Sequence, residues 1–286
     1  MSNLCYLNGN IISLDEACIS INDRGVLYGD GLFETVRIYN GIPFLIEEHL
    51  QRMREGALAL HISLPGTLPE MKEAVDEILA ANEMRDGFMR LTLTRGSDVR
   101  GIWPKTNDNS TFFITTNPSV PYTPEQYRQG IKASFISFPL NENSPQVGFK
   151  TLNYLDNILG RREAYYKGVD EGIFLNQKGY LVEGTASNLF IIKNNVLYTP
   201  PTESGLLPGI TRAVVLKLAS KTYRVEEQNL SPAFLKGAEE AFLTNSLMEI
   251  MPLVKIDEDI IGSGFAGAIT VNLYRNYQEY IKSNLA

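Results

Sequence analysis

The sequence predicts an α+β protein built from two domains. Its 286 residues are many for one domain and enough for two. Strand-like segments cluster with helices but do not alternate with them regularly, which argues against a doubly wound sheet. Because 44% of the residues are hydrophobic, each domain can bury a core of its own.

The first part of the chain carries two hairpin signals and two helix signals. Asn8-Gly9 and Asn40-Gly41 each stand between apolar runs, as in tight β-hairpin turns. Residues 47–60 and 68–83 have helical periodicity and acidic first turns. Strands are expected at 87–96 and 110–116.

A proline-rich stretch marks the expected domain boundary. "NPSVPYTPEQ", residues 117–126, holds three prolines in ten residues, which is typical of a linker. We therefore expect a small N-terminal domain over 1–118, a linker over 119–126 and a larger C-terminal domain over 127–286.

The second part of the chain is rich in strands and ends in helices. Hairpins are expected at 174–184 and 191–199, and helices at about 211–222 and 266–283. Another helix should follow Lys150. Apolar residues recur there at helical spacing, and we expect them to form its apolar face: Leu152, Leu155, Ile158 and Leu159.

Composition disfavours several classes of protein. The net charge of −7 offers no basic surface for nucleic acid, and no apolar run approaches the length of a membrane helix. The N-terminus lacks the pattern of a signal peptide. Two cysteines and two histidines are too few for a disulfide framework and argue against a zinc site or a Ser-His-Asp mechanism. We expect a cytoplasmic, metal-independent protein.

Three segments of the second half suggest chemistry when they are considered together. Lys150 lies at a helix entrance, where it is either a surface lysine or an amine held inward for catalysis. Glu183 ends a strand and is followed by small residues, so it is a turn residue or a functional carboxylate. Pro208-Gly209 precede a helix whose apolar face is formed by Val214, Val215 and Leu218.

The start of that helix could bind an anion. "GIT", residues 209–211, offers free backbone N–H groups and a hydroxyl at a helix N-terminus. The same residues could simply cap the helix. "FLTNSLMEIMP", residues 242–252, adds Thr244, Asn245 and Ser246 between apolar runs, as a further polar site or an ordinary turn.

Several motifs resemble one known family in the right order along nearly the whole chain. They are "YGDGLFETVRIYNG" with "HLQRM" (28–53), "KTLNYL" (150–155), "DEGIFLNQKGYLVEGTASNLFIIKNNVLYTPP" (170–201) and "LPGITR" (207–212). The chain resembles class IV, fold-type IV, pyridoxal-phosphate enzymes. These comprise branched-chain aminotransferases, D-amino acid aminotransferases and 4-amino-4-deoxychorismate lyases. The pair E-G-T-x-S-N and P-G-I-T-R is specific to that group.

The resemblance implies a fold, a cofactor and an assembly. The fold would be a small N-terminal α+β domain and a larger C-terminal β-barrel-like domain. The cofactor would be pyridoxal 5'-phosphate (PLP), lying between the domains. Members of the family form homodimers, so a homodimer is expected here too.

The resemblance also assigns roles to individual residues. Lys150 would bind the cofactor covalently and then move a proton as a general acid–base. Glu183 would keep the pyridine nitrogen protonated, and Tyr154 would hydrogen-bond the ring oxygen. Leu207 would pack on the ring. The phosphate would be held by Arg52, Ile210, Thr211 and Ser246.

Substrate recognition is divided among several candidates. Phe33 and Thr35 lie in a segment that differs between the subfamilies, and Thr35 matches the lyases. Arg37, Arg90 and Arg100 are three candidates for binding a substrate carboxylate, because guanidinium groups bind carboxylates bidentately.

Three functions follow. We favour an aminotransferase acting on an amino acid, branched-chain or similar, and a 2-oxo acid. A D-amino acid aminotransferase is an alternative of the same class. The second function is a lyase that releases pyruvate and 4-aminobenzoate from aminodeoxychorismate. The third is a non-enzymatic module that binds PLP or another small molecule, and the presence of both Lys150 and Glu183 counts against it.

Overall fold

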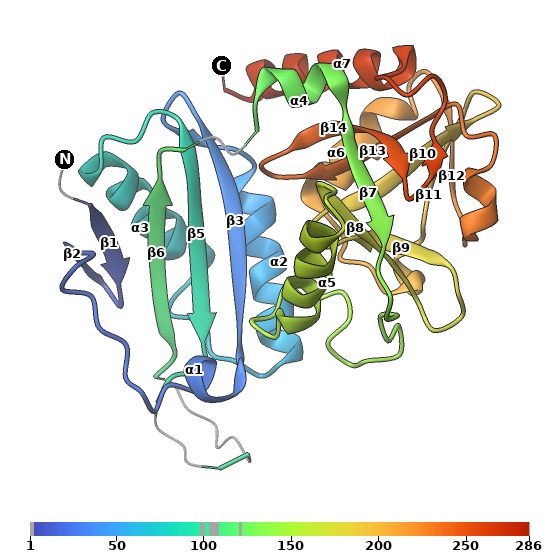
Figure 1. Ribbon diagram of the computed structural model, residues 1–286. Helices are drawn as coiled ribbons and strands as arrows, with labels where there is room; N and C mark the ends of the chain where they lie inside the picture. Colours follow the sequence, from blue (N-terminus) through green and yellow to red (C-terminus); the bar gives the residue numbers. More distant parts are fainter. Residues whose placement is uncertain (1–2, 98–100, 103–108, 120–121, 286) are drawn as a thin grey trace. The chain divides into compact units, whose positions relative to one another are not determined.

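The computed structural model describes residues 3–97, 101–102, 109–119 and 122–285. Contacts divide the first 284 residues into two compact units (Figure 1). The first unit comprises residues 1–120 and 149–153, and the second comprises residues 121–148 and 154–284. Residues 149–153, which we expected in the C-terminal domain, thus group with the first unit.

The first unit is built on one antiparallel sheet of six strands. Its order is β2-β1-β6-β5-β3-β4. The strands are β1 (Leu4–Leu7), β2 (Asn10–Ser13), β3 (Gly31–Tyr39), β4 (Ile42–Pro43), β5 (Gly87–Thr94) and β6 (Thr111–Asn117). Asn8, Asn40, Gly9 and Gly41 all have positive φ in the turns that join β1 to β2 and β3 to β4. Both hairpin predictions are therefore confirmed.

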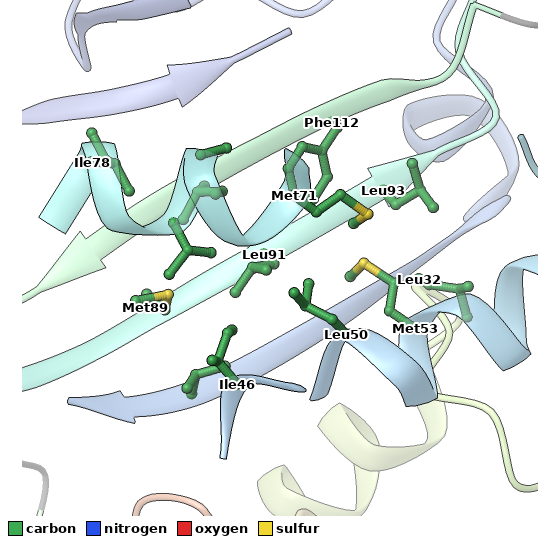
Figure 2. Packing of buried hydrophobic residues seen from close by; sticks show 14 of the residues in the cluster. Leu32, Ile46, Leu50, Met53, Met71, Ile78, Met89, Leu91, Leu93 and Phe112 are labelled. Atoms are coloured by element: carbon green, nitrogen blue, oxygen red, sulfur yellow. The ribbon is translucent and has the colours of Figure 1, made fainter. Parts of the chain in front are cut away.

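Two helices cover one face of this sheet, and the expected substrate residues lie on the other. Side chains of α2 (Ile46–Ala59) and α3 (Leu68–Ala81) pack on β3, β5 and β6 in one apolar core (Figure 2). Since side chains alternate along a strand, the residues between these core positions point to the opposite face. They include Phe33, Thr35 and Arg37 on β3 and Arg90 on β5. A short helix, α1 (Arg24–Tyr28), precedes β3.

A closed barrel forms the centre of the second unit. Six strands pair in a ring, β10-β13-β14-β7-β8-β9, and β9 pairs with β10 to close it. They are β7 (Ile131–Phe135), β8 (Glu171–Leu175), β9 (Leu181–Gly184), β10 (Asn188–Lys193), β13 (Glu240–Asn245) and β14 (Glu249–Ile256). The expected α+β fold with a barrel-like C-terminal domain is confirmed. Strands β11 (Val196–Thr199), β12 (Arg224–Glu227) and β15 (Asp259–Ile260) extend the sheet.

The helices of the second unit lie outside the barrel ring. They are α4 (Pro124–Gln129), α5 (Leu155–Tyr166), α6 (Ile210–Ala219) and α7 (Ala268–Asn284), with the 3₁₀ turns η1 (Thr202–Ser204) and η2 (Pro232–Leu235). The apolar face expected for α6 is buried as predicted, through Val214, Val215 and Leu218. Helix α4 begins inside the expected linker, capped by Thr123, and residues 120–121 of that linker lie outside the described residues.

The predicted apolar face of α5 is wrong. Leu155 is 65% exposed and Ile158 is 57% exposed, whereas Gly160 and Ala164 are buried. The helix packs on β8 through these two small residues. A Cβ on Gly160 would lie 2.6 Å from Phe174 Cζ, so only glycine allows this close approach.

Candidate active site

Lys150 is held by its main chain against strand β3. Its carbonyl accepts a 2.9 Å hydrogen bond from Phe33 N, and Leu152 N donates to Gly31 O at 2.9 Å. Thr151 forms an antiparallel bridge with Leu32 between these two bonds. The Lys150 Nζ atom lies 4.4 Å from the centroid of the Phe33 ring. The backbone therefore fixes the base of the side chain, and the ring contacts its amine.

Arg90 contacts the same aromatic ring. Its Cζ lies 3.7 Å from the Phe33 centroid, and it is paired with Thr35 across β3 and β5. A cation over an aromatic ring is attracted by the electron-rich face. The first unit thus brings Lys150 together with three of the expected substrate residues. Phe33 contacts both Lys150 and Arg90, and Thr35 pairs with Arg90.

Arg37 makes different contacts. It donates to the backbone carbonyls of Ile38 and Gly87, at 2.7 Å for the latter, and its guanidinium lies over the Tyr39 ring. The bond to Gly87 joins the end of β3 to the start of β5, which is a structural role. Arg100, the third candidate for the substrate carboxylate, lies outside the described residues.

Arg52 is oriented by a buried carboxylate that sequence reasoning missed. Its Nε donates to Glu34 Oε1 at 2.8 Å and its Nη2 to Glu34 Oε2 at 2.7 Å. Glu34 is 1% exposed and points from β3 toward α2. Such bidentate pairs fix the plane of the guanidinium. The signal available in the sequence was His49 and Arg52, three residues apart on one face of a helix.

His49 completes this buried group. Its Nδ1 lies 2.7 Å from Glu34 Oε2, so the ring donates to the carboxylate from that nitrogen. Burial alone would raise the pKa of Glu34, but the Arg52 charge and the hydrogen bonds from His49 and Arg52 outweigh it and hold the pKa at about 2. Burial lowers the pKa of His49, and the charges of Arg52 and Lys150 act in the same direction. At neutral pH the group therefore comprises one anion, one cation and a neutral imidazole.

The second unit holds Glu183 through two hydrogen bonds to one oxygen. Glu183 Oε2 accepts from Asn188 Nδ2 at 3.1 Å and from Leu207 N at 3.2 Å. Both donors come from neighbouring elements, because Asn188 pairs with Glu183 across β9 and β10 and Leu207 precedes α6. The carboxylate and the segment before α6, both expected in the site, are thus directly bonded.

The N-terminus of α6 begins next to this carboxylate. Gly209 is its N-cap residue and makes no side-chain capping bond, so Ile210 and Thr211 stand in the first turn without one. Backbone N–H groups at such a position, together with the helix dipole, favour an anion. Thr211 is buried and hydrogen-bonds the side chain of Tyr277 from α7.

Ser246 lies in a turn that is held by the side chain of Asn245. Asn245 Oδ1 accepts from Leu247 N at 2.8 Å and from Met248 N at 2.7 Å, so its side chain shapes the turn between β13 and β14. Its amide also donates to Ala186 O at 2.9 Å, in the loop that follows Glu183. Tyr154 is half-buried at the N-terminus of α5, where its carbonyl accepts from Ile158 N.

A comparison with known families shows which family the chain belongs to. A family model described as Amino-transferase class IV matches residues 31–256, most of the chain. The chain belongs to the class IV amino-transferase family. The predicted family is therefore confirmed, and with it the prediction of an enzyme of the class IV transaminase type. Members of the family use PLP.

Curated relatives fall into three groups of this family. The chain is 40% identical to the "Putative branched-chain-amino-acid aminotransferase" of Methanocaldococcus jannaschii, over 96% of this chain and 95% of that one. It is 33% identical to the aminodeoxychorismate lyase of Bacillus subtilis, over 98% and 95%. It is 32% identical to the D-alanine aminotransferase of Bacillus licheniformis, over 98% and 97%.

Solved structures of the family have the same fold. The branched-chain amino acid aminotransferase of Escherichia coli matches with a TM-score of 0.93 and 30% identity, covering 98% of this chain and 94% of that one. A second branched-chain amino acid aminotransferase, solved with pyridoxamine 5'-phosphate, matches with a TM-score of 0.93 and 29% identity, over 98% and 94%. In the part of this chain that the structure describes, no helix is both long and apolar enough to cross a membrane.

Proposed function

We propose that this class IV enzyme is a PLP-dependent aminotransferase that moves an amino group between an amino acid, branched-chain or similar, and a 2-oxo acid. The observation that carries the proposal is that Glu183 is linked to the segment that leads into α6: its carboxylate accepts from Leu207 N, and Asn188, which also bonds Glu183, lies against Gly209 at the uncapped start of the helix. A carboxylate linked in this way to an anion-binding helix end suits a molecule with a basic ring nitrogen and a phosphate. The 40% identity to a relative named for branched-chain amino acids supports the substrate class.

The residues present fit the cofactor. Glu183 would hold the ring nitrogen, Leu207 would pack on the ring, and Ile210, Thr211 and Ser246 would bind the phosphate. Arg52 would add a cation to the same phosphate, and Tyr154 would bond the ring oxygen. Bound PLP would supply an electron sink that allows the substrate's α-proton to leave.

Lys150 would act twice. Its Nζ would hold the cofactor covalently, and as a free amine it would accept the substrate's α-proton and give it back as a general acid. Backbone bonds to β3 fix the base of the side chain from which this amine would act.

Arg90 is the arginine that we assign to the substrate carboxylate. It shares the Phe33 ring with Lys150, whereas Arg37 donates to backbone carbonyls. Arg90 would therefore hold the carboxylate next to the amine that removes the proton. Thr35, which is paired with Arg90, would lie beside the bound substrate carboxylate and contribute to the choice between substrates.

The chain would act as a homodimer. Helix α5 exposes one apolar face, with Leu155, Ile158, Tyr165 and Tyr166 at helical spacing. Large exposed apolar surfaces on globular proteins mark interaction sites, and most interfaces between identical chains are symmetric.

The first test is a half-reaction with the purified, PLP-reconstituted protein. Addition of an amino acid alone should remove the visible absorbance of the lysine-bound cofactor, and addition of 2-oxoglutarate should restore it. L-Leucine and D-alanine, used separately, report the chirality of the substrate. Release of pyruvate and 4-aminobenzoate from aminodeoxychorismate, with no response to any amino acid, would instead identify a lyase.

Lys150→Ala is the matching variant. It should lower turnover by at least about 10⁴-fold, because no other group replaces the covalent link and the mobile base. It should still retain PLP noncovalently. Lys72→Ala, which removes an exposed lysine of α3, is the control and should leave turnover unchanged. Undiminished turnover in Lys150→Ala would refute the assignment.

A further inference from the structure

Asn188 occupies the junction between the two parts of the site in the second unit. It begins β10 and is 4% exposed. Its backbone pairs with Glu183 on β9 and with Thr244 on β13, two residues before Ser246. No role was expected for this residue from the sequence, although it ends the E-G-T-A-S-N motif five residues after Glu183.

The side-chain amide of Asn188 serves two acceptors at once. Nδ2 donates to Glu183 Oε2 at 3.1 Å and to Leu207 O at 2.9 Å. Leu207 N donates in turn to the same Glu183 oxygen at 3.2 Å. The amide, the carboxylate and the peptide of Leu207 therefore form a closed set of three hydrogen bonds, in which moving one group strains the other two.

The other end of the same amide lies against the start of α6. A Cβ on Gly209 would collide with Asn188 Oδ1. Gly209 has ordinary backbone angles, with φ at −69°, so the glycine is needed for space and not for conformation. This close contact between Gly209 and Asn188 determines how near the first N–H groups of α6 lie to Asn188. Because Asn188 also bonds Glu183, it affects their distance from Glu183 as well.

We propose that Asn188 is a positioning residue that fixes the distance and orientation between the Glu183 carboxylate and the anion-binding start of α6. The inference rests on the proposed function, because it assigns these groups to the two ends of one cofactor. The side chain has the chemistry that this position requires. Its two N–H groups satisfy a carboxylate and a carbonyl, and its neutrality adds no charge beside Glu183. Asn188 acts through these groups and not on the substrate.

The test is a double-mutant cycle with Glu183→Gln on the PLP-reconstituted protein. Asn188→Ala should lower kcat for the half-reaction by about 10- to 100-fold, the range for losing hydrogen bonds to a charged group. KM for the amino acid should stay within about twofold, because the substrate carboxylate is held elsewhere. In the Glu183→Gln background, Asn188→Ala should lower kcat by less than about threefold. The reason is that the carboxylate to which Asn188 donates has already been replaced.

Cofactor binding supplies a readout that does not depend on turnover. Asn188→Ala should raise the dissociation constant of PLP about 10-fold or more. Asn176→Ala removes another buried asparagine of the second unit, one that bonds Ser204 O, and serves as the control. It should lower the melting temperature without changing PLP affinity or kcat.

A second variant keeps the inference testable if Asn188→Ala does not fold. Gly209→Ala inserts a methyl group against the amide and should also weaken PLP binding about 10-fold. Additive effects of Asn188→Ala and Glu183→Gln on kcat, or wild-type PLP affinity in both Asn188→Ala and Gly209→Ala, would overturn the inference. A wild-type chain that binds no PLP would instead refute the proposed function, so the two failures are distinguishable.

Discussion

Two polar side chains of α2, Arg52 and His49, meet at the carboxylate of Glu34. This carboxylate is almost fully buried. A buried carboxylate in such a place is costly unless its partners satisfy it, and here the cation and two kinds of donor do so. Glu34 therefore decides where the guanidinium that we assign to the phosphate can point.

Glu34→Gln should destabilise the protein by about 3–5 kcal/mol at pH 7, because the partly buried charge of Arg52 then loses its carboxylate partner. Urea unfolding measures this loss. Glu47→Gln, the same replacement at an exposed position of α2 that pairs with Lys72, is the control and should cost less than about 1 kcal/mol. Equal effects of the two changes would contradict the role of Glu34.

The same residue should make stability depend on acid pH. The pKa of Glu34 is lowered to about 2 in the folded protein, below the ordinary 4.5 of a glutamate. A carboxyl group whose pKa is lowered by folding contributes its full stabilisation of the folded protein at a pH above its pKa in the unfolded chain. This contribution is lost as the pH falls toward its pKa in the folded protein. The free energy of unfolding should thus fall between pH 4.5 and about 2, and less steeply in Glu34→Gln.

Helix α5 shows how far individual elements could be predicted. The α6 face was predictable because Val214, Val215 and Leu218 are large and recur at helical spacing. The position of α5 in the sequence was predicted, but the side of the helix that is buried was not. The buried side packs through Gly160 and Ala164. Small residues carry almost no hydrophobic signal, while the large Leu155 and Ile158 suggested the wrong side.

Gly160→Leu should therefore destabilise the protein. Its Cβ would already lie 2.6 Å from Phe174 Cζ, and the remaining atoms would have to displace the packed ring. We expect a loss of about 2–4 kcal/mol, or a melting temperature lower by roughly 4–16 °C. Arg162→Leu, at an exposed position of the same helix, is the control and should change stability by less than about 0.5 kcal/mol. A Gly160→Leu protein as stable as the parent would show that the helix packs differently.

At the scale of the whole molecule, local sequence patterns predicted individual elements better than the contacts between elements that are far apart in the sequence. Turn residues predicted the hairpins, and the motifs of the family predicted Lys150 and Glu183. Closure of the barrel was expected only from the family resemblance, since pairing of β10 with both β9 and β13 depends on contacts that no local pattern encodes. Asn188 and Glu34 were missed for the same reason, because their partners come from other elements.

The proposed homodimer is tested at this scale. Ile158→Asp places a charge in the exposed apolar face of α5 and should weaken self-association at least about 10-fold, as a buried unpaired charge is costly. Sedimentation velocity over a range of concentrations measures the change. Leu58→Asp, at an exposed position of α2, makes the same kind of substitution and should leave association unchanged. A wild-type chain that sediments as a monomer would refute the dimer.

The return of residues 149–153 to the first unit has a consequence for synthesis on the ribosome. The N–H of Phe33 and the carbonyl of Gly31 bond to residues that are made about 120 positions later, after strand β7 of the second unit has emerged. A nascent chain that ends before Lys150 must leave this edge of β3 without its native partner. The two units therefore cannot be completed in the simple order, one domain after the other, in which many multidomain chains fold. The lysine that we assign to catalysis lies in the segment that completes the first unit.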